Sequence, residues 1–303
     1  MRIALIFNPT AQGDKARHLR GQLDEISGEC LLMPTEGPGH AEDLAEQAVA
    51  EGCEVVVAAG GDGTVQEVSN GLVRHPGGLA RVALGILPLG TVNVLARVLA
   101  IPLDFEAAWR VIQRGHTRAI DLPWMELQID GETRRRCFPA LGGAGLDARA
   151  CELVGWKMKK HSAQFAYIFA GFQAVSETMP TFRVEADGHV IESAELIMLG
   201  NGPMYGGPFD VFPNARLDDG KVDAIVAEKV NGWRAVEYAH AILTGTLPAL
   251  DGVHYLQAES IKLTPLSDER VVAQLDGDAW GELPANISVE PRALRMVVPQ
   301  PEN

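Results

Sequence analysis

The chain has 303 residues, of which 47% are hydrophobic and 22% are charged, so it is long enough to bury the core of one large or two ordinary globular domains. Its formal net charge of -14 argues against nucleic acid as a partner, because binding to a phosphate backbone depends on concentrated Lys and Arg. The four cysteines stand far apart, with no Cys-x-x-Cys spacing and no clustered His, which indicates neither a zinc site nor a disulfide framework.

The N-terminal segment and the length of the apolar runs together indicate the cellular location of the protein. Residues 1–7 contain too few apolar positions before Asn8-Pro9 to form a secretory signal. No apolar stretch in the chain reaches the ~18 residues that a membrane span needs. We therefore expect a cytoplasmic protein, or one that is peripheral at the inner face of the membrane.

Short apolar runs alternate with helical stretches over the first 120 residues. The runs lie at 3–7, 30–33, 55–59 and 83–87, and the helical stretches at 14–26, 40–51, 65–72 and 92–99. This alternation predicts a parallel α/β sheet. Ligands of such sheets bind outside the carboxyl ends of the strands, and each run here ends in a polar or glycine-rich loop. The sequence thus predicts one cleft shared by the loops at 8–13, 34–37, 60–64 and 88–91.

The third of these loops, Gly60-Gly61-Asp62-Gly63-Thr64, separates an apolar strand from a helix. Its glycines allow positive φ and close backbone approach, and the amide groups at the start of the helix present donors and a positive dipole to an anion. The carboxylate of Asp62 would repel phosphate unless a cation or a donor intervenes, which indicates either a magnesium-nucleotide complex or an orienting hydrogen bond. The alternatives are an ordinary strand-to-helix turn and, for Thr64, a purely structural helix cap.

From about residue 122 the pattern changes to short strand-like runs separated by the pairs Asp130-Gly131, Asp187-Gly188 and Asp251-Gly252, which favour antiparallel hairpins. One helical stretch at 162–179 carries an apolar stripe that we expect to lie in the core. A mainly β domain over 123–289 is therefore predicted to follow a domain over 1–122. The last segment, 290–303, is expected to return to the first domain as an added strand.

A further set of motifs occurs in a fixed order along nearly the whole chain, and this ordered set resembles the lipid kinase family built on the diacylglycerol kinase catalytic domain. The resemblance includes the bacterial soluble branch and extends to sphingosine and ceramide kinases. The loop at 60–63 alone is also found in NAD kinases and phosphofructokinase-like folds, so the specificity lies in the order of the set. The matching segments are Asn8-Pro9-Thr10, Thr35 with residues 38–41, residues 60–67, 87–93, 120–122, 143–148, 201–207 and 213–223, and Asp276-Gly277-Asp278.

The resemblance implies a fold, an activity and two cofactors. The implied fold is α/β, with a parallel α/β domain like that of NAD kinase and phosphofructokinase followed by an antiparallel, β-sandwich-like domain. The implied activity transfers the γ-phosphate of ATP, with Mg²⁺, to a hydroxyl of diacylglycerol, a sphingoid base or a related lipid in a cleft between the domains. The residues expected to bind the nucleotide are Asn8, Pro9, Thr10, Thr35, Gly60, Gly61, Asp62, Gly63, Thr64, Glu67, Gly90, Thr91 and Asn93.

By the same resemblance, the group that accepts the hydroxyl proton lies in an Asp-Gly-Glu segment near the end of the second domain. This chain has Asp278 at the third position, which shortens the reach of the carboxylate by one methylene, roughly 1.5 Å. We expect Asp278 rather than Asp276 to act as the base. Lys15 and Lys160 match positions at which relatives place cations toward the cleft, and Lys157 and Lys159 are alternatives to Lys160.

Two metal sites are implied. Asp62 and Asp121, with Glu67 behind them, are expected to hold Mg²⁺ near the phosphates, directly or through water. Many relatives have Asp after the Asn of the Gly-Thr-x-Asn segment, and this chain has Val94 there, so one carboxylate of that shell is missing. Separately, Asp219 and the main-chain carbonyls near Arg216 and Lys221 resemble a structural cation site. The competing interpretation is a tight acidic turn without metal.

Two other functions fit part of the same evidence. A soluble NAD kinase-like enzyme would phosphorylate a nucleotide ribose instead of a lipid. A regulatory module that binds ATP and transfers nothing would tolerate Val94 and Asp278, since losses around the reacting groups can leave nucleotide binding intact. The motif at 87–93 and the long hairpin-rich second domain favour the lipid kinase. The sequence does not predict the oligomeric state.

Overall fold

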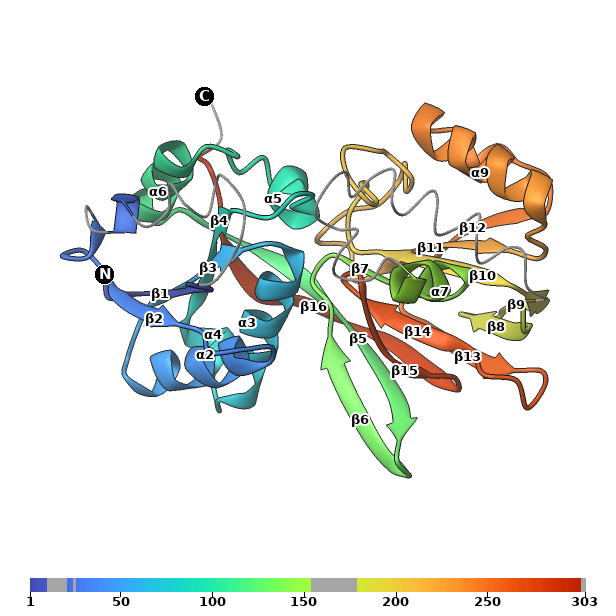
Figure 1. Ribbon diagram of the computed structural model, residues 1–303, viewed down its shortest axis with the longest axis horizontal. Coiled ribbons are helices and arrows are strands. Elements are labelled where there is room, and N and C mark those ends of the chain that lie inside the picture. The colour runs from blue at the N-terminus through green and yellow to red at the C-terminus, as the bar shows by residue number, and fades with distance from the viewer. Residues whose placement is uncertain (10–20, 24–25, 154–178, 301–303) are drawn as a thin grey trace. The chain divides into compact units, whose positions relative to one another are not determined.

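The computed structural model describes residues 1–9, 21–23, 26–153 and 179–300 (Figure 1). The chain divides into two compact units, one of Met1–Ile120 with Arg292–Asn303 and one of Asp121–Pro291. The helix expected at 162–179 and most of the one expected at 14–26 lie outside the described residues.

The first unit is built on a parallel sheet. Its strand order is β2 (Leu31–Pro34), β1 (Ile3–Phe7), β3 (Val55–Gly60) and β4 (Ala83–Pro88), and every neighbouring pair is parallel. The C-terminal end of β16 (Ala285–Val297) joins the same sheet, where Met296 lies beside Leu84 in parallel register. The residues of β1, β3 and β4 are almost all buried, as expected for parallel strands covered on both faces. The predicted parallel α/β fold is confirmed.

Helices cover both faces of this sheet, and Figure 1 shows α2 (His40–Ala50) and α3 (Asp62–Arg74) on one side and α6 (Phe105–Arg114) on the other. Two short helices, α4 (Gly78–Arg81) and α5 (Val94–Val98), precede and follow β4 along the chain. The helix α6 was not expected from the sequence. It begins at Asp104, whose side chain accepts a hydrogen bond from the Ala107 amide at 2.9 Å, and it ends at Gly115 with φ of 65°.

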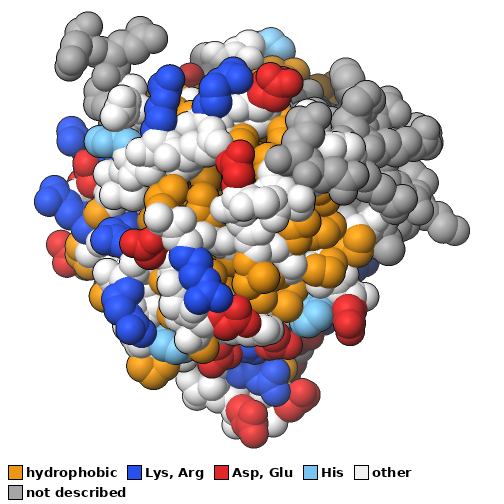
Figure 2. All heavy atoms as spheres, turned by 90° about the vertical axis from the view of Figure 1, so that its left-hand side faces the viewer, with side chains coloured by type: hydrophobic (Ala, Val, Ile, Leu, Met, Phe, Trp, Pro, Cys, Tyr) orange, Lys and Arg blue, Asp and Glu red, His pale blue; other side chains and the backbone are white. Residues whose placement is uncertain are grey.

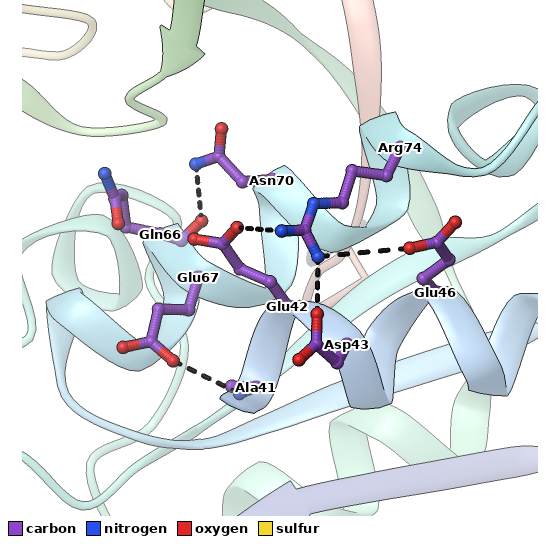
Figure 3. Close-up of polar contacts among 8 residues, drawn as sticks. All are labelled: Ala41, Glu42, Asp43, Glu46, Gln66, Glu67, Asn70 and Arg74. Atoms are coloured by element: carbon purple, nitrogen blue, oxygen red, sulfur yellow. Dashed lines mark hydrogen bonds and ion pairs between the residues drawn. The ribbon is translucent and has the colours of Figure 1, made fainter. Parts of the chain in front are cut away.

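The two helices α2 and α3 are in close contact (Figure 3). The guanidinium of Arg74, in the last turn of α3, lies 2.6 Å from the Asp43 carboxylate and 3.3 Å from the largely buried Glu42 carboxylate. A Cβ at Gly71 would lie only 2.2 Å from the Glu42 carbonyl oxygen, so the helices approach backbone to backbone at this glycine. This contact fixes α3, the helix that begins directly after Gly60-Gly61, against its neighbour.

The second unit contains two antiparallel sheets. One has the order β12 (Val253–Ala258), β11 (Val222–Ala227), β10 (Leu196–Gly200), β7 (Leu141–Gly145), β14 (Val272–Leu275) and β15 (Asp278–Glu282). The other runs from β16 through β13 (Ser260–Pro265) and β8 (Phe182–Ala186) to β9 (His189–Ala194), with β5 (Thr117–Ile129) paired to β16 and to β6 (Glu132–Cys137).

Side chains from both of these sheets form one core. Phe182, Val184 and Leu263 of one sheet are buried together with Ile197 and Ala273 of the other. A shared core between two antiparallel sheets is the arrangement of a β-sandwich. The expected β-sandwich-like second domain is therefore confirmed.

The connections of the second unit differ in part from the predicted hairpins. Asp130-Gly131 and Asp187-Gly188 join β5 to β6 and β8 to β9, and all four residues have positive φ. The hairpin predicted at Asp251-Gly252 is wrong, because β11 and β12 are connected through α9 (Gly232–Thr244) and the short helix η1 (Leu247–Ala249). A second helix that the sequence did not predict, α7 (Leu146–Leu153), follows β7.

The surface carries charges of both signs. On the face that Figure 2 shows, acidic and basic side chains are intermingled around an apolar area, and they form no continuous basic surface there. Within the described parts of the chain, no helix has both the length and the apolar character needed to cross a membrane.

Candidate active site

The loops that follow β3 and β4 are joined through their backbones. The carbonyl of Gly60 accepts hydrogen bonds from the amides of Leu89 at 3.0 Å and of Gly90 at 3.2 Å. A Cβ at Gly90 would lie 2.5 Å from the Cα of Gly61. Glycine is therefore required sterically where the two loops meet, and together they offer a backbone surface that a phosphate group can approach closely.

The side chain of Asn93 closes the turn that begins at Gly90. Its Nδ2 donates to the Gly90 carbonyl at 2.6 Å, and its Oδ1 accepts from the Gly90 amide at 3.0 Å. The residue is buried and has φ of 54°, a left-handed conformation that asparagine tolerates better than most residues. These two hydrogen bonds fix the turn and leave Thr91 exposed at its tip.

The carboxylate of Asp62 connects the same two loops. Its Oδ1 accepts a hydrogen bond from the Val94 amide at 2.7 Å, at the first turn of α5. Burial raises the pKa of Asp62, and hydrogen bonds from the backbone amides of Val94, Leu95 and Asn93 oppose that rise. Of the two roles that the sequence left open for Asp62, the structure therefore contains the orienting hydrogen bond. Val94 contributes its amide to this contact, while its side chain is buried.

Two further residues of the same segment serve helix α3. The helix begins at Asp62 with Gly61 as its N-cap, so Thr64 lies in the first turn and is not the cap. The Thr64 side chain lies over Gly60, where a Cβ would be 2.2 Å from the Thr64 Oγ1. One turn later, the Glu67 carboxylate accepts a hydrogen bond from the Ala41 amide at 3.2 Å, at the start of α2 (Figure 3).

The loops after β1 and β2 lie at the same edge of the sheet. The amide of Thr35 donates to the carbonyl of Phe7 at 2.8 Å, so the residues that follow these two strands are neighbours. Asn8 is exposed, and Pro9 and Thr35 are half-buried. Three other predicted site residues, Thr10, Lys15 and Lys160, lie outside the described residues. The described loop residues thus gather at the carboxyl ends of four parallel strands, as the sequence predicts for a ligand site of this fold.

In the second unit, the buried Asp121 contacts the acidic turn that precedes β11. Its Oδ2 accepts a hydrogen bond from the Gly220 amide at 2.7 Å, and its own amide donates to the Leu217 carbonyl at 2.7 Å. Its carbonyl accepts a hydrogen bond from the side chain of Asn201 at 2.9 Å. The sequence treated Asp121 and the Asp219 segment as separate sites, and the structure brings them together within one unit.

The acidic turn also has contacts of its own. The Asp219 carboxylate accepts a hydrogen bond from the Lys221 amide at 3.1 Å, and Arg216 lies 3.6 Å from the Asp218 carboxylate. Nearby, burial raises the pKa of the Asp223 carboxyl to about 6, against hydrogen bonds from Tyr255 and from Gln257 at 3.1 Å. The charge of Asp219 adds to that rise.

This raised pKa predicts a pH dependence of stability. The native state binds a proton at Asp223 more tightly than the unfolded chain does, so the free energy of unfolding falls as pH rises from about 4 to about 6. Asp223→Asn should reduce that slope, and thermal unfolding midpoints measured between these two pH values check it. Asp268→Asn, at an exposed turn of the same unit, is the control and should leave the slope unchanged. An equal slope in wild type and Asp223→Asn would contradict the prediction.

The segment expected to supply the base forms the turn between β14 and β15. Asp276 and Gly277 occupy the turn with φ of 49° and 89°, and Asp278 is the first residue of β15, opposite Leu275. The Oδ1 of Asp276 accepts a hydrogen bond from the Leu141 amide at 2.8 Å, and its amide donates to the Leu141 carbonyl at 2.8 Å. Asp276 thus fastens the turn to β7, while the side chain of Asp278 is exposed.

Sequence reasoning assigned no role to three polar residues beside this turn. Gln274 of β14 is buried, and its Nε2 donates to the Asp147 Oδ2 at 2.8 Å. The Tyr205 hydroxyl donates to the Asp147 Oδ1, and the Gln274 Oε1 accepts from the Gly277 amide at 2.8 Å. A glutamine within the otherwise apolar strand Val-Ala-Gln-Leu is the signal that the sequence offered.

The described residues contain no ready-made cluster of metal-ligating side chains. In the described portion of the chain no three His, Cys, Asp or Glu side chains are gathered to hold a metal ion. The Oδ1 of Asp62 and the Oδ2 of Asp121 already accept backbone hydrogen bonds. Mg²⁺ that is held mainly by phosphate oxygens and water needs only one or two carboxylates from a protein.

Comparison with known proteins gives a consistent result over both units. Residues 2–125 match the family model of the diacylglycerol kinase catalytic domain, and residues 141–298 match that of the YegS C-terminal NAD kinase beta sandwich-like domain. The chain is 33% identical to a diacylglycerol kinase of Staphylococcus aureus over 294 residues, which cover 94% of this chain and 88% of the relative.

A second relative and a solved structure agree with these matches. A diacylglycerol kinase of Staphylococcus saprophyticus is 31% identical, over 94% of this chain and 91% of the relative. The crystal structure of a diacylglycerol kinase from Bacillus anthracis is similar with a TM-score of 0.75 and 25% identity, covering 98% of this chain and 97% of the other.

Proposed function

The chain belongs to the diacylglycerol kinase catalytic domain family, and we propose that it transfers the γ-phosphate of ATP to a hydroxyl of diacylglycerol or a related lipid. The observation that carries this proposal is that family similarity extends over both units, while the glycine loops after β3 and β4 meet at the ligand-binding edge of the parallel sheet. Among the described residues, no helix could cross a membrane. Because the proposed acceptor is a lipid, we propose that the protein contacts a membrane peripherally.

We assign nucleotide binding to residues 1–122 with 290–303, and the lipid substrate to residues 123–289. In the first region, the backbone amides at Gly61 and Gly63 and the exposed Thr91 after Gly90 would supply donors for phosphate oxygens. Asn93 and Asp62 hold these loops in place through the hydrogen bonds described above. The resemblance adds Asn8, Pro9, Thr10, Thr35, Gly60, Thr64 and Glu67 to the same site.

Mg²⁺ enters this proposal as part of the nucleotide complex. Asp62 and Asp121 are the carboxylates that would hold it, directly or through water. The ion would neutralise charge that develops on the phosphate oxygens during transfer. Glu67 lies behind them in this assignment, and Val94 stands where many relatives have a further carboxylate.

The reaction needs a group that accepts the proton of the lipid hydroxyl, and we assign this role to Asp278. Its carboxylate takes the proton as the hydroxyl oxygen bonds to the γ-phosphorus, and the bond from that phosphorus to the bridging oxygen of ADP breaks. Two observations support Asp278 rather than Asp276. The side chain of Asp278 is exposed, and the carboxylate of Asp276 accepts a hydrogen bond from the Leu141 amide. Lys15 and Lys160 would act as point charges toward phosphate, by resemblance alone.

We also propose that the acidic turn before β11 binds a structural cation through the Asp219 carboxylate and the carbonyls of Arg216 and Lys221. The contacts of this turn support the proposal: the Asp219 carboxylate accepts the Lys221 amide, and the buried Asp121 carboxylate accepts the Gly220 amide. Adding millimolar MgCl₂ or CaCl₂ to chelator-treated protein should raise the unfolding temperature of wild type and not of Asp219→Asn. An equal rise in Asp268→Asn is the expected control result. No rise in wild type would favour the metal-free turn.

The proposed activity is tested by incubating the protein with ATP, MgCl₂ and a panel of acceptors in detergent micelles. Diacylglycerol, a sphingoid base and a monoacylglycerol represent the lipid class, and NAD represents the soluble alternative. Mass spectrometry should show one lipid heavier by one phosphate. Phosphorylation of NAD alone would select the NAD kinase-like enzyme, and ATP binding without any product would select the regulatory module.

A further inference from the structure

We propose that Gln274 is a positioning residue for the carboxylate of Asp278, and that Asp147 holds Gln274 in the required orientation. This inference rests on the proposed function, in which Asp278 accepts the proton of the lipid hydroxyl. The structural basis is a continuous chain of hydrogen bonds from Asp147 through the Gln274 side chain to the Gly277 amide, one residue before Asp278.

The environment of Gln274 explains why both ends of its side chain must be bonded. Only 1% of the residue is exposed, and its neighbours along β14 are Ala273 and Leu275, which are also buried. A buried amide without partners costs free energy, so such groups are almost always hydrogen-bonded in native proteins. Because the Asp147 carboxylate only accepts when it is ionised, the Nε2 group must face Asp147 and the Oε1 must face Gly277.

The position of Asp147 is itself fixed. It lies in the first turn of α7, which begins at Leu146 directly after β7, and a Cβ at Gly143 of that strand would lie 2.0 Å from the Asp147 Oδ2. Tyr205 and Gln274 are the donors to its two oxygens. Burial raises its pKa to about 6 against these two hydrogen bonds, so the ionised form at neutral pH depends on them.

The strands around Asp147 contribute few other charges. β7, β10 and β14 contain no titratable side chain, and β15 contains Asp278 and Glu282. In α7 itself, Arg149 pairs with Glu152 at 3.0 Å. The hydrogen bonds from Tyr205 and Gln274 therefore stabilise the ionised form of Asp147 against burial. Changing Gln274 alters the protonation of Asp147 directly.

The turn is held on two sides, and each contact fixes a different residue. Asp276 is bonded to Leu141 of β7, and Gly277 is bonded to Gln274 of β14. The pairing of β14 with β15 also shifts register between Ala273 and Gln274, so Gln274 lies beside an irregular point of the ladder. Without the Gln274 contact, the backbone beside Asp278 loses the side-chain restraint on Gly277, and the ladder pairing of Asp278 with Leu275 no longer has that support.

Gln274→Leu tests this role because it removes both hydrogen bonds at similar size. Displacing a reacting group by about 1 Å can cost about a hundredfold in rate, so we expect kcat for lipid phosphorylation to fall by about tenfold to a hundredfold. KM for ATP should change little, since the proposed nucleotide loops lie in the other unit. Hydrogen exchange at the Gly277 amide should become faster in this variant.

The matched control is Gln257→Leu. Gln257 lies in β12 of the same sheet and also donates to a buried carboxylate, that of Asp223, at 3.1 Å. Gln257→Leu should lower the unfolding temperature by less than Gln274→Leu, because Gln257 is only half-buried, and it should leave kcat within about twofold of wild type. Assays of all variants are run well below their unfolding midpoints, so that loss of folded protein does not enter kcat.

Gln274→Glu gives a readout that a merely structural role would not produce. Its carboxyl can accept from Gly277, but it faces the Asp147 carboxylate and can donate to it only while the pair holds a proton. The ratio of variant to wild-type kcat should therefore fall as pH rises from 6 to 8. A kcat for Gln274→Leu within twofold of wild type, or a pH-independent ratio for Gln274→Glu, would overturn the inference. An inactive wild type would instead refute the proposed function.

Discussion

Replacing Asp278 with alanine is expected to lower kcat for lipid phosphorylation by about 10²-fold to 10⁴-fold, the range that a general base supplies. The residue is exposed at the start of β15, so its removal should not disturb folding. KM for ATP should remain near the wild-type value, because the proposed nucleotide site uses the loops of the first unit. Steady-state kinetics with varied ATP at saturating lipid measure both quantities.

Two further variants sharpen that test. Asp268→Ala removes an exposed turn carboxylate of the same unit and should leave kcat unchanged. Asp278→Glu restores the residue that the family pattern has at this position and lengthens the reach by roughly 1.5 Å, so it should retain activity. Full activity in Asp278→Ala would remove the residue from the mechanism.

Replacing Gly90 with alanine is expected to weaken ATP binding by about tenfold or more, which corresponds to about 1.4 kcal/mol of binding free energy. The added Cβ would lie 2.5 Å from the Cα of Gly61 and 2.7 Å from the Asn93 Oδ1. The first of these contacts is with backbone, which cannot rotate away, so the two loops must separate. Isothermal titration with ATP and MgCl₂ measures the change in Kd.

The control for this effect is Gly28→Ala, because a Cβ there would meet no atom within 4 Å. Both variants should keep the circular dichroism of the wild type at the assay temperature. An unchanged Kd for Gly90→Ala would mean that ATP does not use the joined loops after β3 and β4.

The parts of the fold that local pattern determines could be predicted from the sequence. The apolar runs that become β1, β3 and β4 are buried on both faces, so their composition alone distinguishes them. Their loops then share an edge by the geometry of a parallel sheet. The helix α9 has comparable local signals in Asn231, which caps it, and in Gly245, which follows its last residue with φ of 68°, although the hairpin pattern predicts no helix there.

Other features could not be predicted because the deciding partner is distant in sequence. Asp251-Gly252 has the same composition as two true hairpin turns, and only the helix between β11 and β12 separates it from them. Glu67 lies in a glycine-rich segment that suggests a metal, and its carboxylate accepts the Ala41 amide of another helix. Asp147 and Gln274 are 127 positions apart, so no local pattern shows their contact.

The role of Asp62 illustrates the same limit at the candidate site. A carboxylate between glycines suggests a cation or a hydrogen-bond donor, because both stabilise negative charge. The donor that the structure supplies is the Val94 amide, 32 positions away in the chain. The side chain of Val94 departs from the family pattern, but the contact uses only the Val94 backbone amide. The identity of the side chain therefore does not reveal the contact.

The most direct test of the central claim is transfer of label from γ-³²P-labelled ATP in a mixture that contains both diacylglycerol micelles and NAD. Wild type should place the label in the lipid fraction, and Asp278→Ala should do so at least a hundredfold more slowly. Label that appears in NAD, or that remains in ATP with wild-type protein, would contradict that claim.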